Sequence, residues 1–100
     1  MMNAYVYIIF SKKLDRFYTG ITSLDVNERL ANHLSKKYGK LHYTYKADDW
    51  ELFWNLPCEN ISQARKIELH IKKMKSKTYI KNLVKYAEIS EKLLLKYKSI

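Results

Sequence analysis

A lone carboxylate among basic residues is the strongest sign of chemistry in this sequence. Glu68 is the only acidic residue between Glu59 and Glu88, and the basic residues near it are Arg65, Lys66, Lys72, Lys73, Lys75 and Lys77. A hard cation such as Mg²⁺ is often held by one or two carboxylates together with phosphate oxygens and water. Glu68 could therefore bind a metal ion in a basic, phosphate-binding cleft. The alternative is an ion pair with Lys72 one helical turn later, worth about a few tenths of a kcal/mol.

Two tyrosines in consecutive apolar runs are the next candidates. Tyr7 lies in the middle of the first run, and Tyr18 lies two residues before Gly20 in the second. Tyrosines paired across neighbouring strands usually serve packing. Because a free phenol titrates near pH 10, a tyrosine needs nearby positive charge to act as a base at neutral pH. Gly20 indicates either a bulge or a place where another group approaches the backbone closely.

Arg29 and His33 form a cationic pair with helical spacing. Residues four apart lie one above the other on a helix, and these two flank the apolar stripe of Val26 and Leu30. Packing alone does not select a cationic pair at the boundary of an apolar face. Exposed pairs with this spacing are nevertheless common, so both interpretations stay open.

The elements that must position these residues follow from periodicity and from capping signals. β-branched and aromatic runs predict strands over residues 4–10, 16–21 and 50–56, the first two forming a hairpin. Helices are predicted from Val26 to Gly39, over residues 61–74 and 79–84, and over residues 89–97, with a loop over residues 40–49. Pro57 should end the third strand. The order ββαβααα predicts an α+β fold, a small three-stranded antiparallel sheet flanked by helices.

Composition predicts one folded domain over residues 1–100. The hydrophobic fraction is 47%, with 2 glycines and 1 proline, which argues against disorder. No apolar run approaches the ~20 residues of a membrane span, and the N-terminus lacks a signal-peptide pattern. The single cysteine, Cys58, cannot form an internal disulfide or a multi-cysteine zinc site. We therefore expect a cytoplasmic protein that has no membrane partner.

The positive charge gathers in the C-terminal part of the chain. The net charge is +9, and residues 61–100 carry 11 basic and 3 acidic side chains against 8 and 7 in residues 1–60. A basic face on a small domain favours a polyanionic partner, most often nucleic acid. The alternative is a lysine-rich surface that serves solubility alone.

Taken in order, these features resemble the GIY-YIG nuclease superfamily. The matching segments are Tyr5-Val6-Tyr7, Tyr18-Thr19-Gly20-Ile21-Thr22, Glu28-Arg29-Leu30 with His33, and the stretch from Ala64 to Ser76 around Glu68. The likeness covers about residues 3–86 and is greatest to small standalone members, which are related to the N-terminal nuclease domain of the excinuclease of excision repair. Residues 87–100 are predicted to form an additional C-terminal helix.

The resemblance implies a metal-dependent DNA endonuclease that hydrolyses phosphodiester bonds, in DNA repair or recombination, with Mg²⁺ or Mn²⁺ as cofactor. Tyr7, helped by His33, would take a proton from the attacking water. Arg29 would supply positive charge beside the phosphate, and Tyr18 would position the phosphate or the water. Glu68 would hold the metal ion next to the leaving oxygen.

Further residues also match family positions. Gly20 belongs to the second motif, and Asn82 is the best candidate for a late asparagine. The lysines that would contact the DNA backbone without reading its sequence are Lys72, Lys73, Lys75 and Lys77, so binding should weaken steeply with salt. Two positions differ from the family pattern. Tyr5 replaces the glycine of the first motif, and Ile21 stands where the excision-repair nucleases carry a lysine, which argues against their type of DNA contact there.

Two alternatives to a nuclease remain open at this point. The first is a nucleic-acid-binding module that keeps the fold with weak catalysis, since a shared fold does not guarantee activity. The second is a protein-interaction domain in which the last helix docks a partner through Ile89, Leu93, Leu94 and Tyr97. Those side chains could equally cover the domain's own core.

Overall fold

The computed structural model describes residues 4–23, 25–36, 39 and 42–98. Within these residues the elements follow the order β1 (Ala4–Ser11), β2 (Arg16–Thr22), α1 (Val26–Leu34), η1 (Tyr43–Lys46), β3 (Glu51–Cys58), α2 (Ile61–Met74), α3 (Lys77–Lys85) and α4 (Ala87–Lys96). The three strands form one antiparallel sheet in the order β2-β1-β3. This arrangement confirms the predicted α+β fold class.

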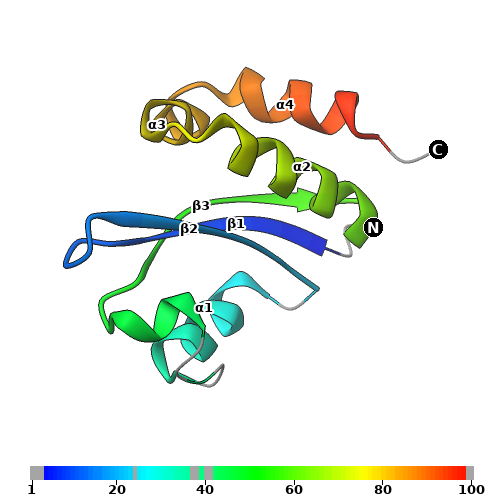
Figure 1. Ribbon diagram of the computed structural model, residues 1–100. Coiled ribbons are helices and arrows are strands. Elements are labelled where there is room, and N and C mark those ends of the chain that lie inside the picture. Colours follow the sequence, from blue (N-terminus) through cyan, green and yellow to red (C-terminus); the bar gives the residue numbers. More distant parts are fainter. Residues whose placement is uncertain (1–3, 24, 37–38, 40–41, 99–100) are drawn as a thin grey trace.

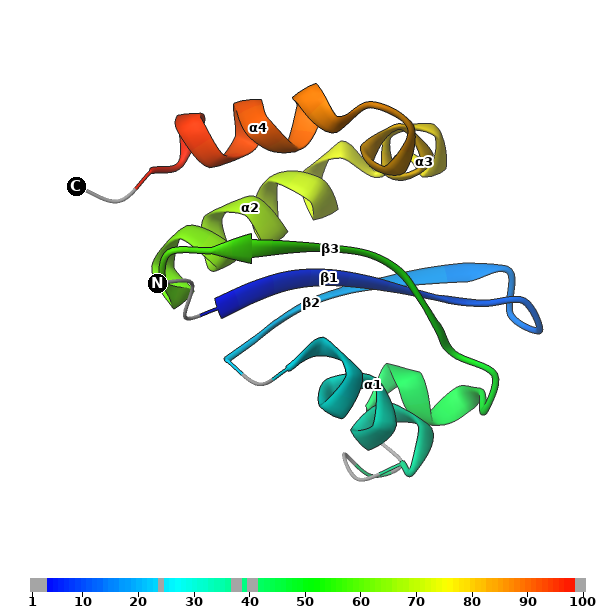
Figure 2. The same cartoon turned by 180° about the vertical axis from the view of Figure 1, so that it is seen from behind.

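The helices cover both faces of the sheet (Figure 1). The helix α1 and the 3₁₀ helix η1 lie against one face and α2 against the other, with α3 and α4 outside α2. The view from behind shows the same layers (Figure 2). Since no helix of the described residues is both long and apolar enough, none could cross a membrane.

The central strand β1 supplies buried side chains to both layers, which explains why its sequence is apolar without interruption. Val6 and Ile8 pack in one cluster with Ile67 of α2. Tyr7 belongs to a second cluster with Ile9 and Trp50, against which Val26 and Leu30 of α1 pack. The alternation along β1 therefore places Tyr7 on the face that carries α1 and η1.

Two predicted boundaries were wrong around the third strand. The strand runs through Pro57 to Cys58, and Pro57 pairs with Tyr5. An edge strand tolerates proline because its missing N–H can face away from the sheet. At the other end, Trp50 precedes the strand, and its buried indole N–H donates to the carbonyl oxygen of Thr44 at 2.8 Å.

The helices differ from the prediction mainly at their ends. The helix α1 ends at Leu34 instead of reaching Gly39, and Lys36 has a left-handed φ of 59°; residues 37 and 38 lie outside the described residues. The helix α3 begins earlier than predicted, at Lys77, because the Ser76 hydroxyl caps it by accepting from the Tyr79 N–H. The predicted loop contains η1, although residues 40 and 41 lie outside the described residues.

The last helix covers the domain's own core. Leu93 is buried in the cluster that α2 forms with the sheet, and Ile89, Leu94 and Tyr97 pack against that cluster. The Gln63 side-chain amide donates to the carbonyl oxygen of Leu94 at 3.1 Å, which ties α2 to α4. The large apolar residues of this helix are thus mostly used inside the chain, and Leu95 is the large one that is exposed, at 74%.

Candidate active site

The ring of Tyr7 lies against the backbone of the neighbouring strand. Tyr7 is paired with Gly20 in the β1–β2 ladder, whose register is regular throughout. A Cβ atom at Gly20 would stand 2.5 Å from the Tyr7 hydroxyl oxygen and 2.7 Å from its Cζ atom. Gly20 is therefore needed for close approach, which decides between the two interpretations of this glycine, since its pairing contains no bulge.

Replacing Gly20 with alanine should displace the Tyr7 ring. We expect a loss of about 1–3 kcal/mol in the free energy of unfolding, because the added methyl overpacks a buried site. Urea denaturation of Gly20→Ala, Tyr7→Ala and the double variant measures the coupling between the two residues. Alanine at position 20 should cost much less when Tyr7 is already alanine; an equal cost in both backgrounds would show that the Tyr7 ring is not the obstacle.

The Tyr7 hydroxyl meets both predicted residues of α1. Its oxygen is 2.8 Å from Nε2 of His33 and accepts a hydrogen bond from Nε of Arg29 at 3.1 Å. Tyr7 and His33 are buried, with exposed fractions of 1% and 0%. The i, i+4 spacing on α1 and the alternation of β1 thus bring three of the predicted site residues to one hydroxyl group.

The hydrogen-bonded chain continues from His33 through η1 to Tyr18. Nδ1 of His33 is 2.7 Å from the Thr44 hydroxyl, and the same hydroxyl is 2.9 Å from Nδ1 of His42. Nε2 of His42 is 3.3 Å from the Tyr18 hydroxyl. Sequence reasoning missed His42 and Thr44 because it treated residues 40–49 as a loop. No local signal marked them: the His42 ring caps η1 by accepting from the Thr44 backbone N–H, and histidine is not among the residue types that favour an N-cap.

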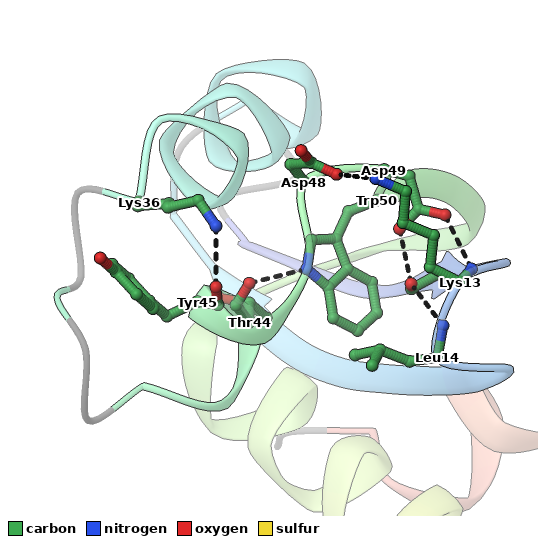
Figure 3. A network of polar contacts seen from close by, with 9 residues as sticks. Lys13, Leu14, Lys36, Thr44, Tyr45, Asp48, Asp49 and Trp50 are labelled. Atoms are coloured by element: carbon green, nitrogen blue, oxygen red, sulfur yellow. Dashed lines mark hydrogen bonds and ion pairs between the residues drawn. The ribbon is translucent and has the colours of Figure 1, made fainter.

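A second polar network, separate from the hydrogen-bonded chain between Tyr7 and Tyr18, holds η1 in place (Figure 3). The carboxylate of Asp49 accepts from the Ser11 hydroxyl at 2.6 Å and from the Lys13 backbone N–H at 2.9 Å. Asp48 forms an ion pair with Lys13 at 2.7 Å. These contacts tie the segment after η1 to the β1–β2 turn, and the Trp50 indole bonds back to Thr44. The position of Thr44 is therefore set by packing and by hydrogen bonds distant in sequence.

Burial and neighbouring positive charge keep His33 neutral. Desolvation, then the charge of Arg29 and then that of His42, lower the pKa of His33 from 6.5 to about 4. The pKa of His42 is also lowered, by burial and by Arg29. Both rings are thus neutral at pH 7, and each offers one donor and one acceptor nitrogen.

This lowered pKa predicts a specific loss of stability in acid. The unfolded chain takes up a proton at His33 below pH 6.5, whereas the folded chain does so only near pH 4, so stability is full above pH 6.5 and falls between those values. Between pH 7.5 and 4.5 the wild-type free energy of unfolding should fall by about 2–3 kcal/mol more than that of His33→Gln. Urea denaturation at both pH values measures the difference, and equal losses in the two proteins would refute the assignment.

Glu68 lies on α2, across the sheet from α1. Its side chain is mostly buried, with ion pairs to Lys72 at 3.3 Å and to Arg65 at 4.0 Å. The predicted ion pair between Glu68 and Lys72 is therefore present. Within the described part of the chain, no group of three or more His, Cys, Asp or Glu side chains could hold a metal ion.

A cleft of about 450 Å³ lies beside β2 and is lined by residues of η1, α2 and α3 as well as of that strand. Tyr18 and Thr19 of β2 and Tyr43 of η1 line it, together with Lys72 of α2. The other lining residues are Arg16, Phe17, Ile71, Lys75, Ser76, Lys77 and Ile80. Tyr18, which belongs to the hydrogen-bonded chain, and Lys72, the ion-pair partner of Glu68, thus face one basic space.

Of the predicted site residues, Lys73 and Asn82 do not line this cleft, and Lys77 lines it but also forms an ion pair. Lys73 lines a different hollow, between α2 and α4. Lys77 lines the cleft and also forms an ion pair with Asp15 at 3.2 Å. Asn82 is half-buried on α3, where its carbonyl oxygen accepts from the Tyr86 N–H at the end of that helix.

Comparison with protein families gives one result of direct relevance. Residues 3–82 match the family model described as the GIY-YIG catalytic domain. Comparisons with curated proteins and with solved structures gave no match. The family match spans both tyrosine motifs, the Arg29 and His33 pair on α1, and Glu68 on α2. With four-fifths of its length covered by this match, the chain belongs to the GIY-YIG catalytic domain family.

Proposed function

We propose that this protein is a metal-dependent DNA endonuclease that hydrolyses phosphodiester bonds, with DNA repair or recombination as its setting. The observation that carries the proposal is the Tyr7 hydroxyl, held between Nε of Arg29 and Nε2 of His33 at 3.1 and 2.8 Å. A phenol in this position has a base on one side and a permanent cation on the other. That combination suits the removal of a proton from a water molecule.

The proton path in this proposal uses groups in direct contact. As the attacking water gives a proton to the Tyr7 oxygen, Tyr7 passes its own hydrogen to Nε2 of His33. Because Tyr7 gives up one hydrogen as it receives another, its oxygen carries only the transient negative charge of the transfer, which Arg29 stabilises; once substrate is bound, Arg29 also stabilises the charge on the phosphate. A phosphate beside Arg29 also offsets one cause of the lowered pKa of His33, and so makes the imidazole a better acceptor when substrate is present.

Glu68 would supply one carboxylate to a hard divalent ion that is shared with the substrate. A single carboxylate holds Mg²⁺ or Mn²⁺ only with additional oxygen ligands, which phosphate and water provide. When bound, such an ion supplies Lewis-acid stabilisation of the phosphate oxygens. Glu68 would have to exchange part of its contact with Lys72 for the ion, and Lys72 would then be available to the DNA backbone.

The basic cleft supports a nucleic-acid substrate bound through its phosphates. Lys72 of α2, Lys75 just after that helix and Lys77 of α3 line it together with Tyr18. Lysines of this kind contact the backbone and give affinity without sequence information. Lys73, facing the other hollow, would contact only a substrate that extends around α2.

Incubating the purified protein with labelled duplex, branched and single-stranded DNA, in Mg²⁺, Mn²⁺ or EDTA, separates the three candidate functions. Metal-dependent cleavage of any substrate supports the nuclease. Salt-sensitive binding that is the same in metal and in EDTA, with no cleavage, would favour the nucleic-acid-binding module. Absence of DNA binding at physiological salt would favour the protein-interaction domain, with the C-terminal helix as its docking element.

A further inference from the structure

Three side chains link the hydroxyl of Tyr7 to the hydroxyl of Tyr18. His33, Thr44 and His42 form the link, with successive contacts of 2.8, 2.7, 2.9 and 3.3 Å from the Tyr7 hydroxyl to the Tyr18 hydroxyl. Each member can donate one hydrogen and accept another. If the single hydrogen of the Thr44 hydroxyl is used toward one histidine, Thr44 can only accept from the other, and the tautomer of that other ring is then set.

The backbone of η1 fixes which histidine receives this hydrogen. The N–H of Thr44 donates to Nδ1 of His42 at 3.3 Å, so this nitrogen carries a lone pair and the ring hydrogen of His42 lies on Nε2. Because this nitrogen carries no hydrogen, the Thr44 hydroxyl, 2.9 Å away, must be the donor in their contact. A hydroxyl has one hydrogen, so toward His33 the Thr44 oxygen can only accept.

The direction of these hydrogen bonds determines the tautomer of His33. Because Thr44 accepts, Nδ1 of His33 must carry the ring hydrogen, and in the neutral ring Nε2 is then a bare acceptor. Nε2 is 2.8 Å from the Tyr7 hydroxyl oxygen, and since this nitrogen has no hydrogen, the phenol hydrogen lies between them; the phenol oxygen also accepts from Arg29. At the far end, Nε2–H of His42 donates to the Tyr18 oxygen, so the Tyr18 hydrogen is not used in that contact.

We infer that Thr44 and His42 are positioning residues, which hold His33 in the Nδ1–H tautomer so that its Nε2 can receive the hydrogen of Tyr7. The inference rests on the proposed nuclease function. In the other tautomer Nε2–H would donate to the phenol oxygen, and Tyr7 would have no base at that nitrogen. In this inference the 3₁₀ helix η1, which contributes no residue to the family motifs described above, serves catalysis by orienting His33.

Histidine NMR tests the tautomer independently of activity. In the ¹⁵N-labelled wild-type protein at pH 7, long-range ¹H–¹⁵N correlation should show a protonated Nδ1 and a bare Nε2 in His33. In Thr44→Val the Nδ1–H loses its buried acceptor, and since a buried unpaired donor is costly, the ring should shift to the Nε2–H form. Thr44→Ser keeps the hydroxyl and should restore the wild-type pattern. An Nε2–H tautomer in the wild type, or an unchanged tautomer in Thr44→Val, overturns the inference.

Cleavage rates then test whether the tautomer matters for the reaction. We expect Thr44→Val to cut DNA about 10- to 100-fold more slowly than wild type, a smaller loss than that of the charged orienting residue of a serine protease. Thr44→Ser should recover most of the rate, and Tyr45→Phe in the same 3₁₀ helix is the matched control. Full activity in a Thr44→Val protein whose tautomer has shifted would overturn the positioning role. A wild-type protein that cuts no DNA would instead refute the proposed function, while the NMR result still reports the tautomer.

Discussion

Replacing Tyr7 with phenylalanine should slow DNA cleavage by about 10²- to 10⁴-fold, the usual range for losing a general acid–base group. The substitution removes one oxygen and leaves the buried ring in place against Gly20. Arg29 and His33 lose the group that both contact, so no atom remains between the base and the cation. Single-turnover cleavage of a labelled branched duplex in Mg²⁺ measures the effect.

Tyr5→Phe is the matched control for this variant, because Tyr5 lies on the same strand and is half-buried. It should cut at the wild-type rate. Fluorescence anisotropy should give the same DNA affinity for all three proteins, because the phosphate contacts lie mainly with the lysines of the cleft. If Tyr7→Phe cuts within about threefold of wild type, the phenol hydroxyl takes no part in proton transfer.

Replacing Glu68 with glutamine should remove most metal-dependent cleavage, by about 10²-fold or more. Lewis-acid stabilisation is worth several kcal/mol, and glutamine keeps the size of the side chain without its charge. The ion pairs with Lys72 and Arg65 are also lost, but both partners are at least half exposed and such pairs contribute little to stability. Raising the Mn²⁺ concentration should recover part of the rate if the defect lies in metal binding.

Two further variants separate the metal-binding role from the ion-pair role. Glu88→Gln, at an exposed position of α4, controls for the change in net charge and should leave cleavage unchanged. Lys72→Met breaks the same ion pair from its other end and keeps the carboxylate. If Lys72→Met and Glu68→Gln respond to metal concentration in the same way, Glu68 serves the ion pair alone.

The parts of the fold that depend on local patterns could be predicted from the sequence. The uninterrupted apolar run of β1 and the helical period from Ile61 to Met74 placed a strand and a helix close to their observed bounds. Spacing also placed Arg29 and His33 on one side of α1, although no local signal showed that His33 would be fully buried against Tyr7.

The missed part of the site depends on contacts between segments distant in sequence. Thr44 is 11 residues from His33 and reaches it because Asp49 bonds to Ser11 and Lys13, and because Trp50 bonds back to Thr44. None of these partners has a fixed spacing that a reader of the sequence could use. The same holds for Glu68, because periodicity places it on a helix but does not say which face of the sheet that helix covers.

The rate of plasmid nicking most directly tests the claim that this protein cuts DNA with Tyr7, Arg29 and His33. Supercoiled plasmid is incubated under identical conditions with the wild-type protein in Mg²⁺, with the wild-type protein in EDTA, and with Tyr7→Phe in Mg²⁺. We predict that only the first reaction accumulates nicked circles at a measurable rate. Equal nicking in all three reactions would identify a contaminating activity and contradict the account, as would failure of the wild-type protein to nick plasmid or branched DNA in either metal.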